Sequence, residues 1–394
     1  MLRCRNARSQ GVSTVAAAAR AFAWDRRGAD VQLCRSRSRL AFVREAVDAA
    51  RTFERFGVKL IHPSTDQAAA IVQAMQAVVT AGGRIAPLPI EQDSLRAIQR
   101  HLLHVAAELT PAADTLPDDL AARLPGEVLR RETVRILALL PPIDQQVRPE
   151  KVAVVEAAAR QLGVEDRGVE LLRQAVRGQH KRMAMSMMRR SVAHYWSPTG
   201  KARLRDWLDM VRIMLPPIPG IYSMLRNEAL LAKYQALGRK PATTLGYALH
   251  RFYMERGFPL PGEPKSFPEG WGKHEVYHVL SEYDSTLQGE MLNAAFSGGN
   301  TEKLCMDLLL ATLLQFQAGR QILPGPHPTG LLQPDAFFRA VARGAAMNVD
   351  LLAGAWNIWS VVDTPLDELR IRFGIPLLSD DERTNLIRAE ALIV

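Results

Sequence analysis

Residues 274–290 read HEVYHVLSEYDSTLQGE, and this stretch governs how the remainder of the chain is interpreted. Its two histidines, His274 and His278, are four residues apart, so on one helix their imidazoles project from the same face about one turn apart. Both rings can then bind a single metal ion. Glu290 lies twelve residues beyond His278, which on a straight helix is about 18 Å away and too far to share that ion.

A turn inside the stretch would remove this difficulty. Residues 282–286 read EYDST, a composition common at helix ends, and Ser285 followed three residues later by Gln288 is typical of a capping box. We therefore expect two helices that double back near Ser285 and place Glu290 beside the histidine pair. Two imidazoles and one or two carboxylates, with coordination positions left open, fit Zn²⁺ or a redox-active ion such as Fe²⁺.

Two other interpretations of the HExxH pattern remain open. A zinc metallopeptidase needs a third ligand, and six residues after the second histidine, where metzincins have a histidine, this chain has Asp284. In the other large class of zinc peptidases a distant glutamate on a later helix would serve. Alternatively, the histidines are buried, bond to Glu275, Glu282 or the backbone, and stabilise a helix junction without any ion.

Hydrophobic residues at helical spacing recur along most of the chain, and no strand-like alternation interrupts them. Proline and glycine residues separate these segments. At the end of the first one, Gly82-Gly83 supplies residues that readily adopt positive φ. We predict helices over residues 71–79, 95–109, 129–140, 150–162, 168–188, 204–215, 222–237, 243–256, 274–283, 287–296 and 302–322.

The expected fold is all-α, with two helical domains joined by a basic helix and preceded by a disordered, arginine-rich tail. A chain of 394 residues is long enough for two or three domains. We expect residues 1–57 to be the disordered or leader segment, 58–193 the first helical bundle, and 195–394 the domain with the metal motif.

The net charge of +9 is concentrated in the tail. Residues 1–57 hold twelve arginines and five acidic residues, whereas the remainder holds 38 basic and 36 acidic side chains. This nearly neutral body argues against a nucleic-acid partner. The first 24 residues contain four arginines and no acid, which suits a transit peptide or a leader translated from an upstream start. Three widely separated cysteines and the absence of a long apolar run argue against a disulfide framework and a membrane-spanning helix.

The predicted helix over residues 168–188 runs into a basic segment rich in methionine. Cationic heads on apolar stems suit anionic lipid headgroups or a partner helix. A solvated basic face over a methionine-lined core edge explains the same composition. The residues concerned are Arg173, Arg177, Lys181, Arg182, Arg189 and Arg190, with Met183, Met185, Met187 and Met188.

Residues 77–86 read AVVTAGGRIA, and Glu91 follows eight residues after Gly83. This segment resembles the turn signature of the TerB-like helical domain of tellurite resistance. In that family an acidic residue usually occupies the position of Gly82, so the divalent ion found in some members is not expected at this turn. We interpret residues 58–193 as a TerB-like docking or regulatory module.

Three segments, in order, resemble the fourth Coq protein family of ubiquinone (coenzyme Q) biosynthesis. The family motif H-D-x-x-H-x11-E matches residues 274–290, and the match includes Val279-Leu280 and Gly289. Residues 244–252, TLGYALHRF, are similar to its S-L-G-x5-F segment. Residues 364–376, TPLDELRIRFGIP, are similar to its closing L-x-x-L-R-x-x-x-G-I. The matches cover about residues 195–380.

This resemblance implies metal ligands at four residues and a catalytic role for one of them. The ligands are His274, Glu275, His278 and Glu290. Glu275 stands where the family has aspartate, and we expect it either to bind the ion through a bridging water or to act as the catalytic general base. The implied cofactor is a divalent ion, with Zn²⁺ expected first and Fe²⁺ as the alternative. The implied reaction replaces the ring carboxyl group of a polyprenylated 4-hydroxybenzoate-type substrate by hydroxyl.

The resemblance also implies partners and a location. We expect a peripheral protein on the cytoplasmic face of a bacterial membrane, or on the matrix side of the mitochondrial inner membrane, that helps to organise other quinone-biosynthesis proteins. A non-catalytic scaffold that binds prenyl lipid around a structural metal is the alternative. A prenyl tail needs an apolar groove, for which residues 304–316 and 351–362 are candidate linings that could equally be core.

Overall fold

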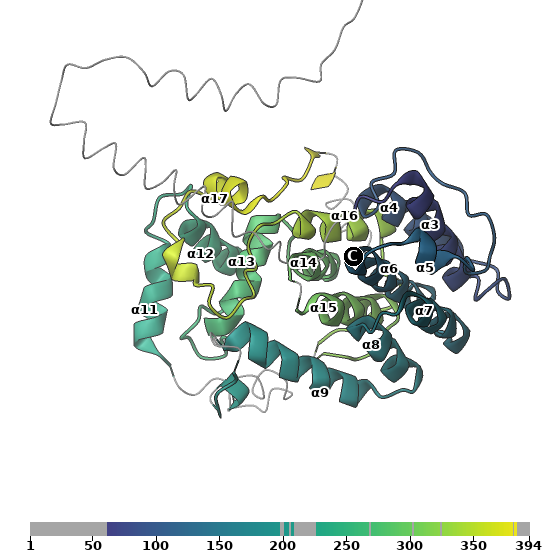
Figure 1. The fold of residues 1–394 in the computed structure, drawn as a ribbon. Helices are drawn as coiled ribbons and strands as arrows, with labels where there is room; N and C mark the ends of the chain where they lie inside the picture. Colours follow the sequence, from purple (N-terminus) through teal and green to yellow (C-terminus); the bar gives the residue numbers. More distant parts are fainter. Residues whose placement is uncertain are drawn as a thin grey trace, which may run out of the picture. The chain divides into compact units, whose positions relative to one another are not determined.

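The computed structural model describes residues 61–197, 201–204, 206–208, 226–267, 269–301, 303–323, 325–380 and 382–383. These residues belong to one compact unit, Arg55–Val394. Its first helices are α3 (Thr65–Val79), α4 (Pro89–His101), α5 (Leu120–Arg123), α6 (Glu127–Leu139), η1 (Pro141–Asp144), α7 (Pro149–Leu162), α8 (Arg167–Val176), α9 (His180–Ser191) and the π-helical turn η2 (Val192–Trp196) (Figure 1).

The helices that follow surround the metal motif. They are α11 (Glu228–Leu237), α12 (Leu245–Glu255), η3 (Glu269–Trp271), α13 (Gly272–Ser281), α14 (Leu287–Asn300), α15 (Cys305–Thr312), the π-helical turn η4 (Leu313–Gln317), α16 (Pro334–Ala345), η5 (Ile358–Ser360) and α17 (Leu366–Phe373). Across the described ranges the structure contains no strand, and two isolated bridges are the extent of β-type pairing. The all-α prediction is therefore confirmed.

Three predicted helices differ from the observed ones. The helix expected over residues 168–188 is two helices, because Gly178 adopts φ +64° between α8 and α9. The helix expected over 95–109 ends at His101, and the one expected over 302–322 gives way after Thr312 to the π-helical turn η4. The window 204–215 and the expected tail of residues 1–57 lie largely or wholly outside the described residues.

The helices on both sides of residue 194 share one hydrophobic core. Helix α4 packs against α16, and α8 packs against α15. Arg167 on α8 also forms a 3.0 Å ion pair with Asp307 on α15. The division into two domains is thus not confirmed. No helix within the described ranges combines the length and apolar character needed to cross a lipid bilayer.

The predicted turn after α3 is present, and it leads to a buried ion cluster. Gly82 and Gly83 have φ values of +71° and +81°, as the glycine cap requires. Glu91, eight residues on, is fully buried and forms an ion pair with the Lys151 ammonium. The same ammonium lies 2.8 Å from Asp144, whose other oxygen accepts the amide of Val147 at 3.1 Å. The ammonium therefore bridges the two buried carboxylates, and Arg148, whose Nε lies 3.3 Å from Asp144, supplies a second positive charge.

Helix α14 is held at the centre of the second group by close backbone contact with α16. A Cβ atom on Gly299 would lie 2.1 Å from the carbonyl oxygen of Val341, and one on Gly344 would lie 1.9 Å from that of Phe296. Glycine at both positions allows the two helices to approach each other more closely than side chains would permit. Helix α13 packs on another side of α14 (Figure 1).

Two buried guanidinium groups bind the last carbonyl groups of α13. Arg343 on α16 donates to the carbonyl of Ser281 at 3.1 Å, and it is 5% exposed. Arg370 on α17 donates to the carbonyls of Leu280 at 3.2 Å and Val279 at 3.1 Å. The final carbonyls of a helix have no partner within it, so these arginines satisfy groups that would otherwise be buried without a hydrogen bond.

The start of α12 is joined to the segment that leads into α17. The amide of Leu245 donates to the carbonyl of Thr364 at 3.0 Å, and the amide of Gly246 donates to that of Val362 at 2.9 Å. A Cβ atom on Gly246 would lie 2.9 Å from the same Val362 oxygen. The segments 244–252 and 364–376 therefore meet, and both border α13.

Replacing Arg343 with methionine should destabilise the protein by about 2–4 kcal/mol, because buried carbonyl groups lose their donors while the apolar volume is kept. The measurement is the free energy of unfolding in urea. The matched control is Arg251→Met, whose side chain is 64% exposed; we expect a change of at most about 0.5 kcal/mol. Equal effects for the two variants would contradict the role assigned to Arg343.

Candidate metal centre

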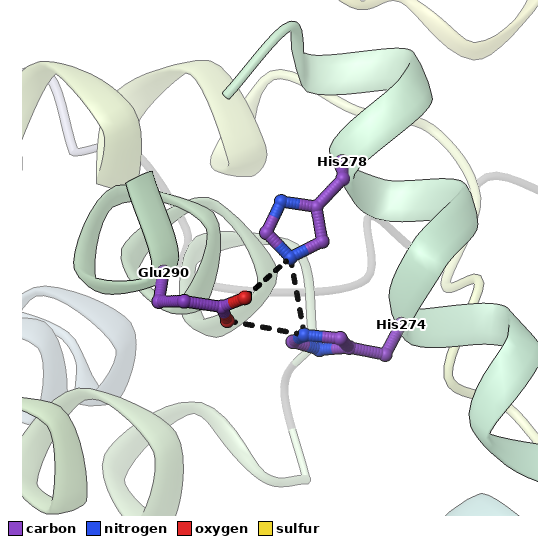
Figure 2. A group of neighbouring side chains, drawn as sticks. All are labelled: His274, His278 and Glu290. Atoms are coloured by element: carbon purple, nitrogen blue, oxygen red, sulfur yellow. Dashed lines mark hydrogen bonds and ion pairs between the residues drawn. The ribbon is translucent and has the colours of Figure 1, made fainter. Parts of the chain in front are cut away.

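His274, His278 and Glu290 converge at one point. The Nε2 atom of His274 lies 3.2 Å from one oxygen of Glu290, and the Nε2 atom of His278 lies 3.3 Å from the other. The two Nε2 atoms are 3.1 Å apart. Figure 2 shows both rings projecting from one helix toward a carboxylate on the neighbouring helix. One potential ligand atom from each residue lies within 4.8 Å of the others, so the expected folding back of Glu290 is confirmed.

The chain reverses between α13 and α14 through a short, tightly bonded turn. Thr286, rather than the predicted Ser285, caps α14, and its hydroxyl accepts the amide of Gly289 at 3.0 Å. The prediction was wrong by one residue because Asp284 binds the Thr286 amide at 2.9 Å and fixes an Asx-type turn. Ser285 instead accepts a 2.9 Å hydrogen bond from Arg256.

Gly289 is required by this turn. A Cβ atom at that position would lie 1.9 Å from the Asp284 side chain and 2.4 Å from the Asp284 backbone oxygen. Even alanine would force the turn to move, and Glu290 is the next residue. The sequence match at Gly289 therefore has a steric explanation in this chain.

The orientation of His278 is fixed by groups on both sides of its ring. The carbonyl of Tyr283 lies 3.0 Å from Nδ1 and can only accept, so Nδ1 carries a proton and Nε2 is the nitrogen left to bind an ion. Phe252 of α12 stacks on the ring, with centroids 5.4 Å apart and planes inclined by 25°. Nε2 therefore faces Glu290: when protonated it donates to that carboxylate, and in the neutral ring its lone pair is free for a metal ion.

Glu275 is not one of the three residues that converge. It is 6% exposed and lies close enough to the histidines for their charges to act on it. Burial, the strongest influence, raises its pKa above the ordinary 4.5, although the two histidines oppose this. A buried carboxyl group beside an ion site, with its pKa raised, suits proton transfer. Its expected roles as metal ligand and general base stay predictions.

The charges of the triad support one another. Burial alone would raise the pKa of Glu290, but hydrogen bonds and charge from the two histidines outweigh it and hold that pKa well below 4.5. Burial would lower the pKa of His274, but the hydrogen bond and charge of Glu290 raise it above 6.5. The carboxylate is therefore ionised at neutral pH, ready to bind a cation.

Two imidazole nitrogens and a carboxylate suit Zn²⁺ or Fe²⁺, and three protein ligands leave room for a substrate oxygen or water. The ion-free alternative correctly expected a backbone bond to one histidine, since Tyr283 accepts from His278. Glu282, another of the partners that this alternative allowed, instead forms a 3.0 Å ion pair with Arg383.

Sequence reasoning missed two residues that support the site. Tyr283 contributes a main-chain carbonyl, which leaves no trace in the residue type. Arg343 was detectable in principle, since residues 337–345, FFRAVARGA, place a cation inside an apolar helix. What the pattern could not reveal is that its partners are the carbonyl groups of Ser281 and Pro376.

A cavity of about 1050 Å³ lies between α4, α14 and α16 and includes the ring of Tyr283 in its lining. None of the triad residues lines it. The two stretches proposed as a prenyl groove do not line it either. Most of residues 304–316 is buried core, while Trp356 and Trp359 of the second stretch are partly buried against that core.

Comparison of the whole chain with models of known protein families gives no match, and comparison with characterised proteins gives none either.

We expect one divalent ion per chain, with Glu290→Gln and His278→Ala each weakening Zn²⁺ binding on the order of 100-fold or more. Glu275→Gln should change the affinity by less than about tenfold, because Glu275 does not converge with the others. Competition with a chromophoric chelator measures these affinities, and exposed His327→Ala is the control. If Glu275→Gln weakened Zn²⁺ binding as strongly as Glu290→Gln does, Glu275 would have to be a metal ligand.

Metal binding should weaken in acid. A proton on His274 competes with the ion, so affinity should fall about tenfold per pH unit below the raised pKa of His274. In the metal-free protein the ion pair between His274 and Glu290 stabilises the fold most between two pH values. These are the ordinary pKa of a glutamate, 4.5, and the ordinary pKa of a histidine, 6.5. Stabilisation by Zn²⁺, measured as a shift in Tm, should therefore grow from about pH 5.5 to about pH 8. A pH-independent shift would contradict this geometry.

Proposed function

We propose that this chain is a metal-dependent enzyme of ubiquinone biosynthesis that replaces the ring carboxyl group of a polyprenylated 4-hydroxybenzoate-type acid by hydroxyl. The observation that carries the proposal is the convergence of His274, His278 and Glu290 on one point from two consecutive helices. The resemblance of three ordered segments to the fourth Coq family supplies the reaction. In this chain the other two segments border α13, the helix that holds the histidines.

Three residues would bind the ion, and Glu275 would transfer a proton. His278, oriented by Tyr283 and Phe252, and Glu290, positioned by the turn at Gly289, would hold the ion together with His274. A bound divalent ion would supply Lewis-acid polarisation of the substrate oxygens and, if redox-active, activation of dioxygen. Glu275, whose carboxyl group is buried beside them, would accept or return the proton of the ring hydroxyl.

The overall reaction is an oxidation. The carbon–carbon bond to the carboxyl group breaks and releases CO₂, and one oxygen atom of dioxygen forms the new ring hydroxyl. The second oxygen atom leaves as water, which requires two protons and two electrons from a separate reductant. The proposed enzyme therefore needs a two-electron donor as a co-substrate.

The proposed substrate resides in a membrane, so we place the protein peripherally on the cytoplasmic face of a bacterial membrane or, alternatively, the matrix side of the mitochondrial inner membrane. Other quinone-biosynthesis proteins are the proposed partners.

The test is turnover of a prenylated 4-hydroxybenzoate in detergent micelles by full-length protein loaded with Fe²⁺ or Zn²⁺, with dithionite-free NADH and a flavin reductase as electron source. Mass spectrometry should detect a product that has lost the carboxyl group and gained a hydroxyl. His278→Ala should abolish turnover while His327→Ala retains it.

Two results would count against the enzyme. Tight binding of prenyl substrate with no turnover under either metal would favour the scaffold, in which the ion is structural. If the wild-type protein does not bind metal, both the enzyme and the scaffold hypotheses are excluded, because each needs an ion bound by His274, His278 and Glu290.

A further inference from the structure

One segment of the body concentrates positive charge. Residues 171–205 contain nine lysines or arginines and no acidic residue, whereas the body as a whole is nearly neutral. The segment comprises the end of α8, all of α9, the turn η2 and the start of the next described piece. The remainder of the body is consequently acidic, with 29 basic and 36 acidic side chains.

Several of these cations have no counter-ion among the residues that the structure describes. Arg173 pairs with Glu156 at 2.6 Å, and Arg190 pairs with Asp307 at 2.8 Å. In contrast, no acidic group within the described part of the chain pairs with the remaining exposed cations of α8 and α9. They are Arg177, Lys181, Arg182 and Arg189.

Two of these four cations share one side of α9 with an exposed apolar side chain. Lys181, Met185 and Arg189 follow one another at intervals of four residues and therefore lie along one side of α9. Met185 is 54% exposed, while Met183 and Met187, on the other side, are buried in the core. A basic face that is merely solvated does not explain an exposed methionine between two cations that lack a partner among the described residues.

Further apolar side chains are exposed beside this helix. Met188 and Val192 form a small buried cluster with Trp196, Ala202 and Trp207, so residues 201–204 and 206–208 contact the end of α9. On that same piece Leu204 is 76% exposed and Leu208 is 49% exposed. Cations surrounding exposed methionine and leucine match a surface that is negatively charged and apolar beneath.

We propose that the face formed by Arg177, Lys181, Arg182, Met185 and Arg189, together with Leu204 and Leu208, docks the protein onto a membrane of anionic lipid. The cations bind headgroups, and the methionine and leucine side chains enter the headgroup–acyl boundary. This inference rests on the proposed function for the membrane location alone, and it does not depend on the metal.

The experiment is flotation of the full-length protein with vesicles of phosphatidylcholine, alone or mixed about two to one with phosphatidylglycerol. Binding should require the anionic lipid and weaken at high salt. Changing Lys181, Arg182 and Arg189 together to glutamine should lower partitioning about fivefold per cation, on the order of 100-fold in all. Met185→Ser should weaken binding a few-fold without changing its salt dependence.

Two controls separate this face from other causes. The first control is a tail variant in which Arg35, Arg37 and Arg39 are changed together to glutamine. It loses the same amount of positive charge as the α9 variant, but it should still bind anionic vesicles through α9. His278→Ala should lose metal and turnover but bind vesicles normally, so failure of docking and failure of the proposed reaction are distinguishable.

Three outcomes would overturn the proposal. The α9 variant could bind as the wild type does while the tail variant does not, which would assign docking to the tail. Neutral and anionic vesicles could bind equally, which would remove the electrostatic basis. The wild type could ignore vesicles but bind a DNA oligonucleotide through the same cations, which would assign the face to nucleic acid.

Discussion

The arrangement of the candidate site depends on how α13 ends. Its last carbonyl groups point into the interior, where each would cost about 1–3 kcal/mol if left without a donor. Arg343 and Arg370 supply those donors from two other helices. Because the guanidinium groups fix the end of α13, they also fix where the turn to α14 begins. The turn in turn determines where Glu290 lies relative to the two histidines.

Local pattern was sufficient for much of the site. The spacing of His274 and His278 predicts their common face, and the cap-forming residues after Ser281 predict the reversal that brings in Glu290. The sequence pattern did not identify the residue that caps α14, because Asp284, Ser285 and Thr286 can all act as N-caps. Only the complete bonding of the turn selects Thr286.

Long-range contacts explain what the sequence did not reveal. A proline-containing segment after Trp196 looks like a linker between domains, yet Arg167 reaches Asp307 and α4 packs on α16 across it. Likewise, the close approach of α14 and α16 depends on Gly299 meeting Val341 and Gly344 meeting Phe296. Each glycine is unremarkable within its own helix, and its necessity appears once the partner helix is in place.

The Lys151 ammonium has a consequence for how the protein responds to its ionic surroundings. Glu91 and Asp144 face a positive charge that is covalently part of the chain, so it cannot be extracted by a chelator or exchanged for another ion. Residues 274–290, by comparison, present a carboxylate whose counter-charge would be a diffusible ion. Fluctuations in metal supply should therefore act on the α13–α14 hairpin while the architecture around α4 and α7 stays constant.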